Sequence, residues 1–235
     1  MAAYFTPEAI KFLRGLKRHN DRAWFTPRKP VFERELKTPM LALIAAINDA
    51  MVEFAPQHLR PPQKAMMRIY RDTRFSADKS PYKARIAAWW SRDGLAKTSG
   101  AGYYFSIRPT EVVIAAGCYM PEREQLLAIR RHLLEQHVEM RRILAGKKLR
   151  TALPRFEGSP LKRPPKGFCA EHPGIDLIRN RQWGFSASLP AELASSPRLL
   201  AEIVQRFRAA TPLIELLNAP LITTQAKRKP VFALY

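Results

Sequence analysis

The chain has few cysteines and no long apolar stretch. Its two cysteines, Cys118 and Cys169, stand far apart and form no CxxC pair, so neither a disulfide framework nor a cysteine-rich zinc site is indicated. It has no apolar run approaching the roughly 20 residues that cross a bilayer, and its N-terminus lacks the pattern of a secretory signal. These features favour a cytoplasmic protein that does not span a membrane.

The motifs of several common enzyme classes are also missing from the sequence. There is no GxxxxGK[ST], and Gly100-Ala-Gly102 precedes an expected strand where a dinucleotide-binding motif would open a helix. HExxH and GxSxG are absent too, and His132 and His137 lie five apart, which does not suit the i,i+4 pair of a zinc helix. We therefore expect no metal and no cofactor, and the sequence leaves open whether the protein is an enzyme.

What the chain has in excess is positive charge. It carries 40 Lys plus Arg against 20 Asp plus Glu, a formal net charge of +20. The excess is most one-sided over residues 61–110, which hold 10 basic and 3 acidic residues. Such a balance indicates an anionic partner rather than a particular fold. A small anionic ligand and a nucleic acid are both compatible with it.

The spacing of apolar residues predicts the secondary structure. Thr6 and Pro7 suit the start of a helix that ends near His19-Asn20, and Thr38-Pro39 repeats this start. Pro27 and Pro30 are expected to interrupt any helix between these two. Further helices are predicted over 31–36, 121–146 and 173–180, with a terminal pair over 197–218 broken at Thr211-Pro212.

Short runs rich in aromatic and β-branched residues predict strands over 66–70, 86–90, 103–108, 112–119 and 183–189. The stretch 153–168 is rich in proline and is expected to be irregular. The sum is an α+β protein with an antiparallel sheet of about four to five strands and helices packed mainly on one face. We expect one domain over residues 1–222 and a basic, then apolar, tail over 223–235.

The segment from Arg68 to Lys83 is the richest in chemistry. Arginine binds carboxylate and phosphate as a bidentate fork, so a loop of this composition suits an anion site. Asp72 would orient the arginines, and the side chains of Tyr82 and Tyr104 would line the site. The alternative is a loop held by internal pairs of Asp72 and Asp78 with its own cations. The predicted ligand-binding cations of the loop are Arg68, Arg71, Arg74, Lys79 and Lys83.

Several ungapped motifs of the chain resemble one protein family. RIYRDTRFSADKSPYK is similar to the signature of the domain-of-unknown-function family 2461, and FLRGLKRHNDRAWF, YYFSIRPTEVVIAAGCYMP and LKRPPKGFCAEHPGIDLIRNRQW extend the resemblance over residues 4–220. The resemblance implies no activity, cofactor or catalytic residue. It favours a working site at the Arg68–Lys83 segment over a purely structural loop.

The last of these motifs adds candidates of its own. Arg163 and Lys166 are predicted to bind the ligand. His172 lies four residues before Asp176, whose carboxylate could orient the imidazole for proton transfer, so these two are the candidate catalytic residues. The alternative is that the His172 ring or the Asp176 carboxylate caps the short helix.

A second interpretation places the charge on a diffuse surface. Arg130, Arg141 and Lys148 fall on one side of an ideal helix, which suits either a solvated face or contact with a nucleic-acid backbone. Aromatic residues could stack bases beside such cations, as in single-strand binders, but aromatic residues at strand spacing are more often part of a core. The candidates for stacking are Trp89, Trp90, Tyr103 and Tyr104. On this view the chain is a nucleic-acid-binding or structural accessory protein. The oligomeric state does not follow from the sequence.

Overall fold

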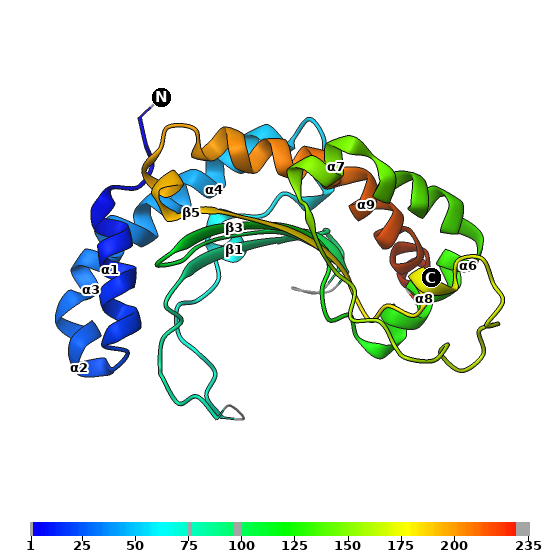
Figure 1. Ribbon diagram of the computed structural model, residues 1–235. Coiled ribbons are helices and arrows are strands. Elements are labelled where there is room, and N and C mark those ends of the chain that lie inside the picture. The colour runs from blue at the N-terminus through cyan, green and yellow to red at the C-terminus, as the bar shows by residue number, and fades with distance from the viewer. Residues whose placement is uncertain (1, 75–76, 96–99, 229–235) are drawn as a thin grey trace, which may run out of the picture. The chain divides into compact units, whose positions relative to one another are not determined.

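The computed structural model describes residues 2–74, 77–95 and 100–228, with side chains given up to Ile222 (Figure 1). The chain divides into two compact units. The first comprises Met1–Trp90, Tyr103–Ala115 and Ala187–Arg208, and the second comprises Ser91–Gly102, Ala116–Ser186 and Ala209–Tyr235. Each unit is described by itself below.

The described residues form an antiparallel sheet of five strands in the order β1-β2-β3-β5-β4. This confirms the α+β prediction. The turn between β2 and β3 is the expected hairpin, and the Arg108 amide donates to the Glu111 carbonyl across it at 2.9 Å. The strands are β1 (Ile86–Ser91), β2 (Ala101–Ile107), β3 (Glu111–Cys118), β4 (Arg155–Glu157) and β5 (Trp183–Pro190).

The first unit opens with a run of helical segments. Pro27 and Pro30 do not interrupt this run, contrary to the expectation, because each lies in the first turn of its segment, where the missing amide would have no partner. The run comprises α1 (Pro7–Arg18), α2 (Arg22–Phe25), a 3-10 turn (Thr26–Arg28), α3 (Lys29–Phe32), a π-helical turn (Glu33–Lys37) and α4 (Thr38–Met51). The unit also holds α5 (Pro62–Ala65) and 3-10 turns at Pro56–His58 and Ala191–Ser195.

Helices of the first unit cover one face of its strands (Figure 1). The indole nitrogen of Trp90 donates to Asn48 Oδ1 of α4 at 2.8 Å, and the Phe207 ring of α9 lies 4.9 Å from the Tyr103 ring. Side chains alternate along β2, so Tyr103 and its same-face neighbours are fully buried. Tyr104 points to the opposite face, is half-buried, and lies 6.5 Å from the Trp89 ring.

The segment predicted as a strand over residues 66–70 forms only two isolated bridges, Met66 with Ala88 and Tyr70 with Tyr82. The Met67 amide donates to the Ala87 carbonyl at 2.8 Å. The segment therefore borders β1 without forming a regular strand. From Arg68 on it belongs to the segment Arg68–Lys83, which we call the arginine-rich loop.

The second unit contains α6 (Arg123–Ala145), which bends at Gln136, together with α7 (Lys147–Ala152) and α8 (Ile175–Ile178). Arg130 of α6 is only 8 % exposed, and its guanidinium donates to the carbonyls of Ile178 at 2.9 Å and Asn180 at 3.0 Å. Burial lowers its pKa. Arg130 therefore holds α8 in place and is not part of a solvated basic stripe with Arg141 and Lys148.

Two further sequence expectations about secondary structure are wrong. The stretch 153–168 contains the short strand β4, and the terminal helix pair is a single helix, α9 (Leu199–Arg228). Pro212 lies inside α9, where Leu213, Ile214 and Leu217 are all buried, and burial outweighs the local cost of the proline. Residues 223–228 of the expected tail belong to α9, and residues 229–235 lie outside the described residues.

Asn218 of α9 bridges a buried backbone position of the second unit. Its side chain accepts from the Ala101 amide at 2.8 Å and donates to the Ala101 carbonyl at 3.0 Å.

Asn218→Ala will lower the free energy of unfolding by about 2–4 kcal/mol, because it leaves two buried backbone groups unpaired. Urea denaturation measures this loss. The exposed Glu215→Ala on the same helix is the control and will change stability by less than about 0.5 kcal/mol.

Candidate anion-binding site

Tyr82 anchors the arginine-rich loop to the first two helices. The Asn20 side chain donates to the Tyr82 carbonyl at 2.9 Å and accepts from the Tyr82 amide at 3.0 Å. The Tyr82 ring stacks on Phe25 with centroids 4.2 Å apart, and burial raises the pKa of its phenol. The residue is only 4 % exposed, so the structure places Tyr82 in the packing that holds the loop.

Within the loop, arginines and aspartates are paired with each other. Arg74 donates to Asp72 in a bidentate fork, with Nε to Oδ1 at 3.0 Å and Nη2 to Oδ2 at 2.8 Å. These hydrogen bonds lower the pKa of Asp72 to about 2. Arg71 pairs with Asp78, whose pKa is lowered first by its bonds from Ser80 and then by Arg71. The Arg74 side chain is 76 % exposed, so its pair with Asp72 shapes the loop more than it stabilises the fold.

A cavity of about 760 Å³ lies beside this loop within the first unit. Its wall comes from α1, from both ends of the loop, from the two residues before β1 and from the β2–β3 turn. The Arg14 side chain of α1 donates to the Pro109 carbonyl at 3.0 Å, which holds α1 against that turn. The cations of the wall are Lys17, Arg71, Lys83, Arg85 and Arg108, and its acids are Asp72, Asp78 and Glu111.

Several donors in this wall have no protein partner. The Nε atoms of Arg71 and Arg108 are buried and hydrogen-bonded to no atom of the described residues. Each guanidinium uses another nitrogen for an acid, Arg71 for Asp78 and Arg108 for Glu111 at 2.8 Å. The side chains of Lys17 and Arg85 form no hydrogen bond or ion pair in the part of the chain that the structure describes. The acids thus orient two arginines, and Lys17 and Arg85 are the wall cations left without a partner among the described residues.

The structure brings together only some of the predicted ligand-binding residues. Arg71, Asp72 and Lys83 line the cavity. Lys79 donates to the Thr73 carbonyl at 3.0 Å and Lys83 to the Arg68 carbonyl at 3.4 Å, so both lysines also brace the loop. Predicted residues that do not contribute to the described lining are Arg68, Arg74, Lys79, Tyr82 and Tyr104.

Three cations of the wall stand outside the predicted ligand-binding set. Arg85 follows the arginine-rich segment by two residues, and Arg108 closes the hairpin that the sequence predicts, so each lay next to a recognised signal. Lys17 lies on α1, far away in sequence. Only the fold, through the contacts of Arg14 and Asn20, brings Lys17 to the cavity.

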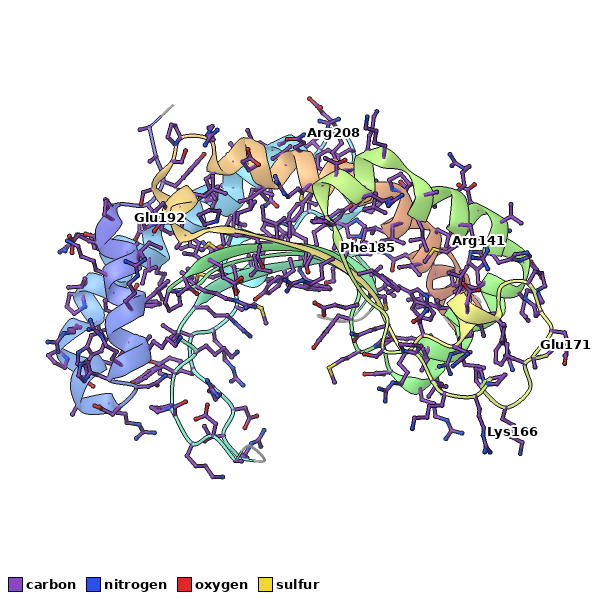
Figure 2. All side chains as sticks on the ribbon, in the orientation of Figure 1. Arg141, Lys166, Glu171, Phe185, Glu192 and Arg208 are labelled. Atoms are coloured by element: carbon purple, nitrogen blue, oxygen red, sulfur yellow. The ribbon has the colours of Figure 1, made fainter. Side chains whose placement is uncertain are left out.

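The second unit holds the remaining candidates. Arg163 and Lys166 are exposed on a loop, and Lys166 projects away from the ribbon (Figure 2). The prediction that Asp176 orients His172 is wrong. The Asp176 carboxylate instead accepts from Arg141 at 2.7 and 3.2 Å. The His172 ring accepts from the Gly174 amide at 3.0 Å through Nδ1, so it caps the turn that begins α8. This is the alternative role that the sequence allowed.

Among the described residues, no group of three or more His, Cys, Asp and Glu side chains is placed to hold a metal ion. None of the helices formed by these residues has the length and apolar character needed to cross a membrane.

The chain is an α+β protein whose first unit has a cavity lined mainly by basic side chains. The model of the conserved hypothetical protein family DUF2461 matches residues 8–216, and the chain belongs to that family. The match includes the arginine-rich loop and every residue of the cavity wall. Neither a curated protein nor a solved structure was found to match the chain.

The pair between Asp72 and Arg74 can be tested by titration. In wild-type protein the Asp72 carboxyl will titrate with a pKa of about 2, below its ordinary 3.8, so the pair persists as pH falls until that range is reached. In Arg74→Ala the Asp72 pKa will rise toward the ordinary value, as followed by NMR of the carboxyl carbon. Asp78 is the internal control, because its hydrogen bonds come from Ser80 and Arg71. An unchanged Asp72 pKa in the variant would contradict the assignment.

Proposed function

We propose that the first unit binds a small ligand carrying phosphate or carboxylate groups in the cavity beside the arginine-rich loop. The observation that carries the proposal is the pair of wall cations, Lys17 and Arg85, whose side chains form no hydrogen bond or ion pair with any described residue. An anionic oxygen forms a charge-assisted hydrogen bond with a cation of this kind. Such an oxygen would offset the charge of both side chains.

The charge of the wall also favours an anion over a neutral ligand. Asp72, Asp78 and Glu111 each accept from an arginine, so the acids are already engaged. The described wall has five cations and three acids, an excess of two positive charges. Because the cavity partly excludes water, this excess attracts an anion more strongly than the same charge would on an open surface. The proposal concerns binding and assigns no reaction.

Binding to the cavity predicts that Arg85→Ala weakens affinity for inorganic pyrophosphate or citrate by about tenfold or more, the value of one charge-assisted hydrogen bond. Isothermal titration at low salt measures it, and the two probes separate phosphate from carboxylate preference. Arg74→Ala removes the same charge from the neighbouring loop and will leave affinity within about twofold, because Arg74 does not line the described cavity.

The comparison between these variants also tests the alternative of a diffuse basic surface. If both substitutions weaken binding equally, and short duplex DNA binds with a steep dependence on salt, the charge acts as a surface and the cavity proposal is wrong. A melting temperature close to that of the wild type shows that each variant is folded.

A further inference from the structure

In the second unit, β4 ends the sheet and has an open edge. It pairs with β5 on one side only, in a register that sets Phe156 opposite Phe185. All three of its residues are exposed, and no backbone hydrogen bond outside the strands involves them among the described residues. The free edge of a strand presents amide and carbonyl groups to which another extended chain can pair.

Phe156 lies where two cavities of the second unit meet. One has a volume of about 600 Å³ and the other about 710 Å³, and both are lined by Leu144, Ala145, Arg150 and Phe156. We call them together the Phe156 groove. The Phe156 side chain remains 42 % exposed although its ring packs on Phe185, with centroids 4.9 Å apart. Apolar surface beside an open strand edge suits the side chain of an added strand.

Positive charge dominates the rest of the groove. Its cations are Arg141, Lys147, Arg150 and Arg179, and its one described acid, Asp176, is already bound by Arg141. Figure 2 labels Arg141 and Phe185 in this part of the unit. The side chains of Lys147 and Arg150 form no hydrogen bond or ion pair with any residue that the structure describes. Their charge is available to an acidic partner.

We propose that the Phe156 groove binds an acidic peptide in extended conformation, which pairs with the outer edge of β4. The peptide backbone would bond to the edge, an apolar side chain would contact Phe156, and acidic side chains would face Lys147 and Arg150. A small anion would not use the strand edge, and the chain's own Lys227-Arg228-Lys229 has the same sign of charge as the groove. The proposal is independent of the anion cavity of the first unit.

The test is a selection of random twelve-residue peptides displayed on phage against the full-length protein, with counter-selection on Arg150→Glu. We expect enrichment of sequences in which acidic and apolar residues alternate, since the two sides of an extended peptide face different surroundings. If no sequence is enriched on the wild type relative to Arg150→Glu, the proposal is wrong.

A selected peptide is then measured by fluorescence polarisation. Arg150→Glu will weaken its binding by about tenfold or more, whereas Lys148→Glu, the same charge reversal at an exposed residue of α7 outside the described lining, will change it by less than about threefold. Equal losses in the two variants would mean attraction by net charge alone and would overturn the site.

Backbone pairing has a separate readout. A version of the peptide with alternate amides N-methylated cannot donate to a strand edge, so its affinity will fall by about tenfold or more if it pairs with β4. Full affinity of the methylated peptide in both possible phases would overturn the edge-pairing geometry. Displacement of the peptide by a short single-stranded oligonucleotide that itself binds tighter would assign the groove to nucleic acid instead.

Discussion

The contact between Asn20 and Tyr82 holds the candidate site of the first unit together. It joins residues 62 apart in sequence through two hydrogen bonds to one backbone position, and the Tyr82 ring stacks on Phe25. Ordering a long loop costs conformational entropy at every residue, and the exposed ion pairs of the loop return little of it. The contact between Asn20 and Tyr82 supplies stabilising free energy that the exposed ion pairs do not. The loop therefore stays ordered beside the cavity.

The acids of the site act on geometry rather than on total charge. Asp78 and Glu111 each engage one nitrogen of an arginine and so fix the direction of the guanidinium plane. The Nε atoms of Arg71 and Arg108 are left buried and unpartnered. An arginine without an acid would be free to turn toward solvent, and one with all its nitrogens paired would have nothing to offer a ligand. Pairing with an acid thus fixes the direction of each guanidinium at the cost of one positive charge.

Local patterns predicted most of the fold and the part of the site that is local in sequence. The period of two over residues 103–108 and 112–119 predicted β2 and β3, and the density of arginine predicted Arg71, Asp72 and Lys83. Lys17 could not be predicted, because its place in the wall depends on packing between α1 and the β2–β3 turn. The strand β4 is too short to show a period, and Pro212 within α9 shows that burial can override a strong local signal.

Part of the net charge of +20 is engaged inside the protein. Arg130 is buried and donates to two backbone carbonyls, while Arg74 and Arg141 each form an ion pair with an aspartate. Each of these cations counts in the formal charge but contributes less to an external field than an isolated one. The free cations named above, Lys17 and Arg85 in one unit and Lys147 and Arg150 in the other, instead line cavities. Recognition by a few oriented cations depends on the shape of the ligand as well as its charge, and this dependence distinguishes both proposed sites from a polyelectrolyte surface.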